Sequence, residues 1–397
     1  MIMKKITYTL SVALVATLFV VLASSCNKNV PEAVPKNFYL QSGNTIGDIL
    51  NNDANYSILK AAVTKAGLMA DLSDRNKVFT VFAPNDAAFT LSGIPAAAIS
   101  VLPASTLASI LQYHIIPGKK LVASEISTTF PNAEFASAFI LPAPNTNPLV
   151  RFTMYPSRNA NGAFVNNVPI TATDIDAANG VIHRLYVVNP PPSKFLWDSI
   201  STSSDLTYLK AAIIRADSGV ATPSKLQTAL SSFGANLTVL APTNLAFQTL
   251  LTGAIYKALM AQGMPDATAL GTARALASTP DVFSNPALYG ALSAQTVKGI
   301  VVYHILGTTV PGIRTFSVNL PTTATAIKTL LNSAVSIHPG VVAKATFVGP
   351  VVGAATFKGL ANATASNVII NPLNPFATDQ NYINGVIMKI DQVLLPQ

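Results

Sequence analysis

Four histidines, one cysteine and 17 carboxylates are the side chains of this 397-residue chain that could do chemistry. Two of the histidines, His114 and His304, directly follow Tyr113 and Tyr303 inside apolar stretches. An imidazole can serve as a general base, as a metal ligand or as a buried hydrogen-bonding group. The residues around each histidine must therefore decide which role it takes.

No metal or catalytic signature accompanies the histidines. A zinc site needs three or four well-placed ligands, and the sequence has no HxxxH or CxxC pair. Asp174 and Asp176 could hold one cation weakly, but alternation along a strand or turn explains them more simply. The motifs of serine hydrolases, dinucleotide sites and phosphate-binding loops are absent from the sequence, and carboxylates are too sparse to favour a glycosidase. We expect no enzymatic activity, no metal and no cofactor.

Cys26 is the only cysteine, and it follows an N-terminal leader. A positively charged start precedes an apolar run from Ile6 to Ala23, and two serines stand before the cysteine. This order is typical of a secretory signal peptide, and its end resembles a bacterial lipobox. We expect residues 1–25 to be removed and Cys26 to be lipidated. An ordinary signal peptide with an unmodified thiol is the alternative.

Lipidation would make a lipid bilayer the first partner of the chain, because several acyl chains hold a protein on a membrane face. Residues 26–36 then read as a short tether. We expect the protein in the cell envelope at the outer membrane, facing the periplasm or the cell surface.

The composition is typical of a membrane protein, but the order of the residues argues against one. Apolar residues make up 50% of the chain and charged residues 11%, and the mean hydropathy is +0.43. Outside the leader, the best rival segment (335–357) is interrupted by a histidine, a lysine and two prolines, so it cannot span a bilayer. The +8 charge comes from 25 basic and 17 acidic residues without a dense basic run, which argues against nucleic-acid binding. A surface polar through uncharged side chains favours neutral partners.

The remainder of the chain contains two copies of one unit. Residues 79–89 reappear as 237–247, residues 111–116 as 301–306, and residues 179–185 as 384–390, all in the same order. The growing offset between the pairs shows that the middle of the second copy is expanded. This expansion is either a binding surface or a tolerated surface insertion, since loop closure entropy grows slowly with length.

Local patterns predict both helices and strands in each copy. Helical spacing predicts amphipathic helices over 57–66 and 207–216, and a further helix over 107–114. Alternating β-branched and aromatic residues predict strands over 78–83, 181–188 and 386–395. Helices are expected to start after 84 and 242, capped by Asn85 or Asp86 and by Thr243 or Asn244. Because these elements do not alternate regularly, we expect an α+β fold.

The three repeated motifs resemble the fasciclin domain family. The resemblance rests on the Thr-Val-Phe-Ala-Pro-Asn segment at 80–85, on the Tyr-His pairs and on the closing Asn-Gly segments at 179–180 and 384–385. It implies two tandem domains, 37–191 and 197–397, each a β-wedge or sandwich flanked by helices. It also implies adhesion or matrix binding to an unknown protein or glycan ligand. A glycan-binding component of a polysaccharide-uptake system is the alternative function.

In this family the Tyr-His pair is implicated in integrin binding in animal relatives, which makes it a candidate ligand contact here. The other reading is a buried, hydrogen-bonded pair that fixes the core, and we prefer it because buried tyrosine and histidine must find partners. Met388 stands where His183 stands in the first copy, so a site common to both domains cannot need that histidine. We expect His338 at the surface and Trp197 at the interface between the domains.

Overall fold

The computed structural model describes residues 42–397 except 131–132, 142–146, 148, 310–311 and 372–377. Residues 44–397 form one compact unit. Cys26, the leader and the tether lie outside the described residues. In the part of the chain that the structure describes, no helix has the length and apolarity to cross a bilayer.

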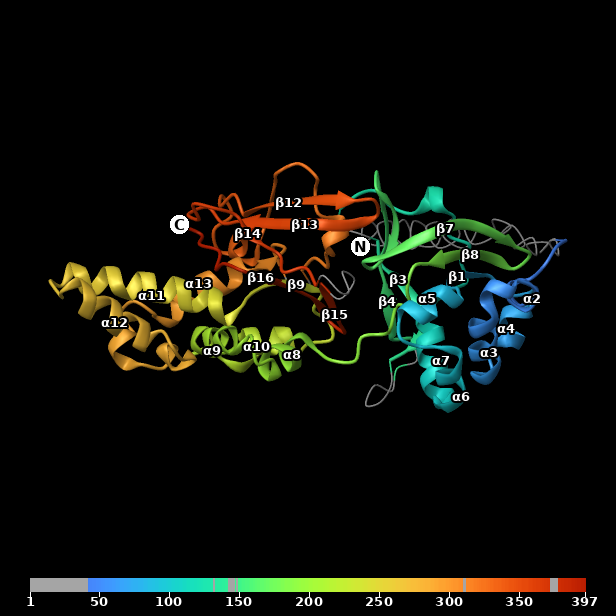
Figure 1. Cartoon of the computed structure of the whole chain (residues 1–397), viewed down its shortest axis with the longest axis horizontal. Helices are drawn as coiled ribbons and strands as arrows, with labels where there is room; N and C mark the ends of the chain where they lie inside the picture. The colour runs from blue at the N-terminus through green and yellow to red at the C-terminus, as the bar shows by residue number, and fades with distance from the viewer. Residues whose placement is uncertain (1–41, 131–132, 142–146, 148, 310–311, 372–377) are drawn as a thin grey trace, which may run out of the picture. The chain divides into compact units, whose positions relative to one another are not determined.

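The first copy places its helices before and after its first strand (Figure 1). Its helices are α2 (Ile46–Asn52), α3 (Ser57–Lys65), α4 (Met69–Ser73), α5 (Asp86–Leu91), α6 (Ala96–Val101) and α7 (Ala104–Tyr113). Its strands are β1 (Phe79–Pro84), β2 (Ile115–Pro117), β3 (Phe135–Ile140), β4 (Arg151–Met154), β5 (Pro156–Asn159), β6 (Gly162–Val165), β7 (Val168–Ala177) and β8 (Gly180–Leu185).

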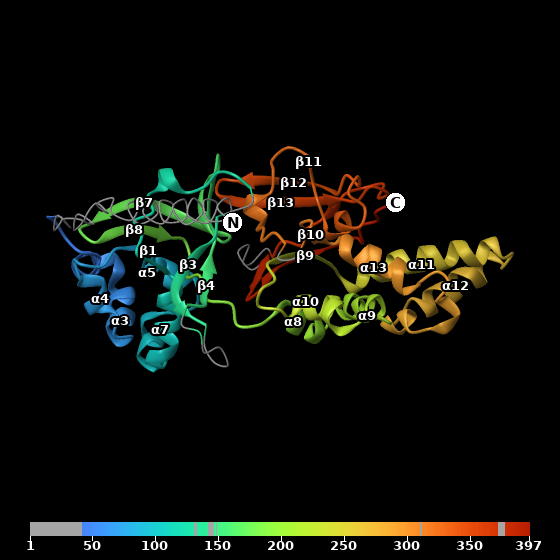
Figure 2. The ribbon, with the colours of Figure 1, turned by 180° about the vertical axis from the view of Figure 1, so that it is seen from behind.

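The second copy follows the same order, but one of its helices is 18 residues long and its eight strands form two four-stranded sheets (Figure 2). Its helices are α8 (Leu196–Thr202), α9 (Thr207–Ala216), α10 (Leu226–Leu230), α11 (Asn244–Ala261), α12 (Asp266–Leu276) and α13 (Ala294–Tyr303). Its strands are β9 (Leu237–Pro242), β10 (Ile305–Leu306), β11 (Thr325–Ile327), β12 (Val341–Val348), β13 (Val351–Lys358), β14 (Ser366–Asn367), β15 (Asp379–Tyr382) and β16 (Gly385–Ile390).

One sheet topology occurs twice. The first copy has the strand order β2-β1-β8-β7, continued by β6 and β5, and the second has β10-β9-β16-β15. In each copy the repeated Thr-Val strand pairs in parallel with the strand that follows the Asn-Gly segment: Phe79 lies opposite Gly180, and Leu237 lies opposite Gly385. The predicted α+β class and the tandem duplication are both confirmed.

Glycine is required at the start of both closing strands. A Cβ atom on Gly180 would lie 1.9 Å from the carbonyl oxygen of Phe79, and one on Gly385 would lie 2.1 Å from that of Leu237. Both distances are far inside van der Waals contact. The glycine of each Asn-Gly segment therefore lets two parallel strands approach at their first pair.

Alternation along the strands builds a layered core. In the second copy Leu237, Val239 and Ile387 pack among the helices. Leu240 and Met388 point the other way and join the residues of the β11-β12-β13-β14 sheet. Because successive side chains leave opposite faces of a strand, one sheet is covered by helices on one side and by strands on the other. This is the β-sandwich flanked by helices that the resemblance implies.

In each pair of predicted caps, one residue caps the helix that follows it and the other bonds to the start of a different helix. Asn85 caps its own helix, accepting from the N–H of Ala88 at 2.9 Å. Asp86 instead accepts from the Ser57 hydroxyl at 2.6 Å and the Ile58 N–H at 2.8 Å, at the start of α3. Thr243 caps α11 and the Asn244 side chain accepts at the start of α9, so the second copy repeats the arrangement.

Among the described residues, the expanded middle of the second copy contains helices and strands. One part extends α11 and adds α12, whose Ala273 is buried in the helix-side core together with Val282 and Phe283. The other part contains the β11–β14 sheet. The predicted strand over 386–395 ends earlier, at Ile390. The carboxylate of Asp391 accepts from the Asn367 N–H at 2.7 Å and the Ser366 hydroxyl at 2.9 Å, and this ties the chain to β14 instead.

Candidate functional site

The two Tyr-His pairs occupy the same place in the two copies, at the end of a helix that leads into the sheet. Tyr113 is the last residue of α7 and Tyr303 the last residue of α13, and each following histidine is the C-cap. The helix delivers all four side chains into the interior, where none is more than 2% exposed. A ligand at the surface cannot contact them without a rearrangement of the core.

Backbone groups hold both imidazoles. Nδ1 of His114 and of His304 lies 2.7 Å and 2.8 Å from the carbonyl oxygen four residues earlier. Nε2 accepts from the N–H of Asn189 at 3.0 Å in the first copy and of Leu394 at 2.8 Å in the second. These partners place the proton on Nδ1 of a neutral ring. Burial lowers the pKa of both histidines to about 4, so each ring is neutral at physiological pH.

The hydroxyl groups of Tyr113 and Tyr303 form hydrogen bonds with different parts of the molecule. The Tyr303 hydroxyl donates to the carbonyl of Gly340 at 2.7 Å and accepts from the N–H of Leu360 at 3.1 Å, all within the second copy. The Tyr113 hydroxyl donates to the Thr153 carbonyl at 3.1 Å and accepts from the Asn381 amide of the second copy at 3.3 Å. The first Tyr-His pair is therefore part of the joint between the domains.

Arg314 lies at that joint, although all its hydrogen bonds are made within the second copy. Its guanidinium, in a residue only 4% exposed, donates to the side chains of Asn236 at 2.6 Å and Asn381 at 3.1 Å and to the carbonyls of Tyr382 at 3.1 Å and Ile383 at 2.9 Å. Its Cζ atom lies 4.9 Å from the ring centroid of Tyr155 in the first copy. A buried guanidinium with four acceptors and an aromatic face is fixed in position.

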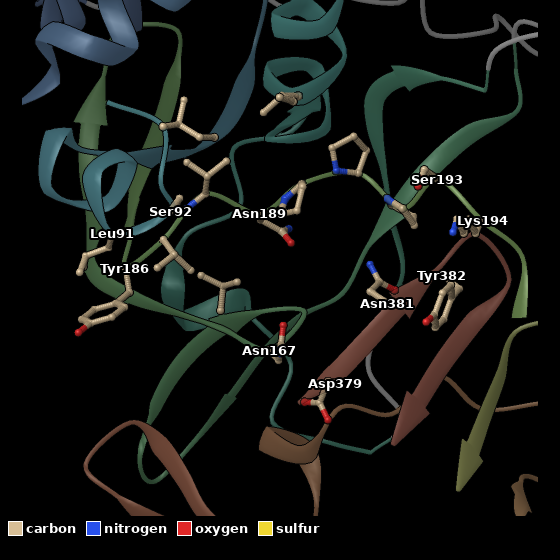
Figure 3. Close-up of a pocket in the computed structure, with 18 residues that line it drawn as sticks. Leu91, Ser92, Asn167, Tyr186, Asn189, Ser193, Lys194, Asp379, Asn381 and Tyr382 are labelled. Atoms are coloured by element: carbon tan, nitrogen blue, oxygen red, sulfur yellow. Dashed lines mark hydrogen bonds between the residues drawn. The ribbon is translucent and has the colours of Figure 1, made fainter. Parts of the chain in front are cut away.

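A cleft of about 580 Å³ opens beside this network, between the two copies (Figure 3). The first copy contributes the end of α5 and the segment 186–194 that includes the three prolines, and the second copy contributes β15. The polar residues labelled around it are Ser92, Asn167, Asn189, Ser193, Lys194, Asp379 and Asn381. Asn189 is also the residue whose N–H holds His114, so the cleft and the buried pair share a wall.

Two buried polar atoms in this wall have no partner among the described residues. One is Oδ1 of Asp379, whose Oδ2 accepts from the N–H of Ser317 at 2.9 Å and from its hydroxyl at 2.6 Å. The other is Nδ2 of Asn189. Burial raises the pKa of Asp379 to about 6. Both atoms are buried, so ordered water inside the wall, and not a ligand in the cleft, is the group that would satisfy them.

His183 and its counterpart Met388 are both buried in the cores of their domains. His183 is buried, with Nε2 2.8 Å from the Leu121 carbonyl oxygen, and its ring stacks on Phe82. Met388 pairs with Leu240 where His183 pairs with Phe82, and it is equally buried.

The carboxylates of Asp174 and Asp176 do not converge. Asp174 accepts from the N–H of Ala123 at 2.8 Å, and Asp176 forms an ion pair with Lys120. Within the described ranges, no group of three histidine, cysteine or acidic side chains could hold a metal ion.

Two placements differ from the expectation. His338 is half-buried rather than exposed, because Nε2 lies 2.8 Å from the Pro396 carbonyl oxygen and the ring meets Tyr303 edge-on. Trp197 packs against the helix-side core of the second domain, not at the interface between the domains. It is the second residue of α8, and the helix turns it onto that core.

Sequence reasoning did not identify Arg314, Asn381 or Asp379. None of the three belongs to a repeated motif, and each acquires its role from a partner distant in the chain. The only sequence signal is that arginine and aspartate are rare in this chain, with 17 acidic residues in 397.

The chain is similar to known proteins over part of its length. A family model described as Fasciclin domain matches residues 54–188. A Synechocystis protein, sll1483, is 32% identical over 155 residues, which cover 38% of this chain and 76% of that protein. A second Synechocystis protein, the uncharacterised sll1735, is 31% identical over 140 residues, covering 35% of this chain and 91% of that protein.

Two animal proteins are similar over different extents. The transforming growth factor-beta-induced protein ig-h3 of Sus scrofa is 32% identical over 149 residues, 38% of this chain, and the match spans only 20% of that longer protein. A solved domain pair from the insect cell adhesion molecule Fasciclin I covers 87% of this chain and 98% of its own, with 14% identity and a TM-score of 0.32.

Proposed function

The chain belongs to the fasciclin domain family, and from this we propose that it is a cell-envelope lipoprotein that mediates adhesion or surface binding. Fasciclin domains are associated with cell adhesion. The proposal adds lipidation at Cys26, which would hold the protein on a membrane while the tandem domains meet a ligand. The ligand is a protein or a glycan of the extracellular surface.

The joint between the domains carries this proposal. Arg314 and Asn381 of the second domain contact Tyr155 and the Tyr113 hydroxyl of the first. A joint with a buried charge and buried amides fixes the two domains as one unit. Their shared clefts are then preformed, and a preformed binding surface loses less entropy on contact with a partner than a flexible one.

The histidines support binding rather than chemical turnover. Both ring nitrogens of His114 and of His304 are engaged by backbone groups. A general base needs a free lone pair aimed at a substrate, and here that lone pair accepts from an N–H of the fold. The motif that seemed most able to do chemistry therefore builds the core.

The test uses the purified chain from residue 27 onward, immobilised on a surface. We expect it to retain intact cells or envelope fragments of its own species well above an albumin-coated surface. The Arg314→Ala variant removes the contact with Tyr155 together with four hydrogen bonds within the second domain, and we expect it to retain fewer cells than the parent. Retention no better than albumin would overturn the proposal.

The cleft of Figure 3 also fits the alternative, a glycan-binding component of an uptake system, because the serine, asparagine and lysine side chains that line it suit hydroxyl groups. The two functions separate in one experiment. Binding to soluble oligosaccharides without retention of cells favours uptake, and retention of cells favours adhesion.

A further inference from the structure

A second groove of about 650 Å³ lies on the joint and shares no lining residue with the cleft of Figure 3. Its first-domain wall is the segment 127–130 and β5 with the turn that follows it, and its second-domain wall runs from 308 to 328 with gaps. Asn159 Nδ2 donates to the Val318 carbonyl at 2.8 Å, and Asn319 Nδ2 donates to the Ser157 hydroxyl at 2.8 Å. These two bonds cross between the domains and fix the groove. Its volume falls within the range of about 300–1,000 Å³ that small-molecule sites occupy.

Arg158 is the unexplained residue in this groove. It stands on β5, is only partly exposed, and its Nε is buried without a hydrogen-bond partner among the described residues. A guanidinium normally finds carboxylates, carbonyls or an aromatic face when it leaves bulk water. By contrast, the guanidinium of Arg314 in the same joint donates hydrogen bonds to four acceptors.

The groove offers positive charge and hydroxyl groups but no negative charge. Arg158 and Lys328 are its two cations, and no aspartate or glutamate occurs among the described residues that line it. Threonine, serine and asparagine side chains supply most of its other polar groups. Phe130, 40% exposed, adds an aromatic face at the rim. An oxyanion would pair with Arg158, and hydroxyl groups beside it would meet the amides and hydroxyls.

We infer that this interdomain groove binds an acidic glycan, with Arg158 pairing with a carboxylate or sulfate group and Phe130 stacking on a sugar face. The inference names the partner class for the proposed surface-binding role and rests on that role. It differs from the expectation of a neutral partner, which follows from overall composition and not from the charge at one site.

A glycan fits better than an acidic peptide. A peptide recognised as an added strand would need free backbone groups along the edge strand β5. At Arg158 that edge is already used, because its N–H donates to the Ser127 carbonyl at 3.0 Å.

The experiment measures binding of the chain from residue 27 onward by calorimetry at fixed salt. The probes are polygalacturonate, dextran sulfate, uncharged dextran and polyglutamate. We expect binding to polygalacturonate or dextran sulfate, at least about tenfold weaker in Arg158→Gln and weaker also in Phe130→Ala. The matched control is Arg274→Gln, which removes one positive charge from an exposed position on α12. Which of the two acidic polymers binds identifies the carboxylate or the sulfate as the group recognised.

Four calorimetric results would overturn the inference: no binding to either acidic glycan, equal losses in the Arg158 and Arg274 variants, dextran binding as tight as that of the acidic polymers, or polyglutamate binding that depends on Arg158. Equal melting temperatures of the variants and the parent exclude a folding defect, and Arg158→Lys provides a second variant if Arg158→Gln is unstable. If cells are retained equally by the parent and by Arg158→Gln, the groove inference fails and the adhesion proposal stands.

Discussion

His114 and His304 are held in the same tautomer by the same kind of backbone partners, one in each domain. The N–H groups that donate to their Nε2 atoms, from Asn189 and Leu394, both lie in the segment just beyond the closing strand of the domain. Each histidine thus ties the helix before the sheet to the chain that leaves it. From this shared geometry we expect both histidines to stabilise the fold.

Replacing His114 or His304 with alanine removes two buried hydrogen bonds and leaves a cavity. We expect each change to lower the free energy of unfolding by about 2–4 kcal/mol in denaturant titrations. Ligand binding by the fraction that remains folded should be unchanged. A loss of binding at unchanged stability would instead make the histidine a ligand contact.

Acid should destabilise the fold through these same rings. Their pKa values are lowered to about 4 in the folded protein from an ordinary 6.5, so the unfolded chain binds protons more readily in between. The stability that this difference provides is complete above pH 6.5 and is lost as the pH falls through 4, by about 3 kcal/mol for each histidine. Melting temperatures measured from about pH 7.5 to pH 4 check this, and His304→Gln should flatten the decline.

Asp379 should have the opposite effect on the pH dependence of stability. Burial raises its folded pKa to about 6 from 3.8, so its contribution is favourable at low pH and is lost as the pH rises through 6. Asp379→Asn keeps the shape and removes the charge. We expect this variant to be more stable than the parent at pH 7 by about 1–2 kcal/mol, with the difference vanishing near pH 4. A variant that is less stable at pH 7 would show that the ionised carboxylate is paired.

Gly180→Ala and Gly385→Ala should each open the parallel strand pair at its first residue. The added Cβ would collide with the carbonyl oxygen of Phe79 or of Leu237. We expect a loss of about 2 kcal/mol or more, or failure to fold. Gly271→Ala is the matched control, because Gly271 lies in α12 with nothing within 4 Å of the added atom. That change should stabilise the helix by about 0.5–1 kcal/mol.

Lipidation predicts a simple fractionation result. In a bacterial host with lipoprotein processing, the parent should enter the membrane fraction and incorporate labelled palmitate. Cys26→Ser should release the protein in soluble form without label. A parent protein found wholly in the soluble fraction would contradict the anchor while leaving the fold untouched.

Much of the architecture could be predicted from repeated motifs. The helix over 207–216 has the predicted bounds, and β1 and α7 differ from their predicted ranges by a few residues. These segments combine strong periodicity with a duplicate elsewhere in the chain. The cap pairs show the limit: Asn85 and Asp86 can both accept from a helix N-terminus, and only the three-dimensional fold assigns Asp86 to α3.

The joint and the grooves could not be predicted because their residues are matched across the domains. Nothing near Tyr113 in the sequence indicates that Asn381 will donate to its hydroxyl. Nothing in the motif of residues 301–306 indicates that the Tyr303 hydroxyl will instead form its hydrogen bonds within its own domain. The two tyrosines are alike in sequence, and they differ only because one faces a neighbouring domain.

The position of the closing strands affects when each domain can fold. β8 lies between β1 and β7, and β16 lies between β9 and β15, so the last strand of each copy fills the middle of its sheet. A chain that emerges from its N-terminus must leave β1 or β9 without its parallel neighbour until that final strand arrives. Such late closure over long separations slows folding. If the chain is exported unfolded, as the proposed function requires, slow folding would keep each domain unfolded until its last strand has crossed the membrane.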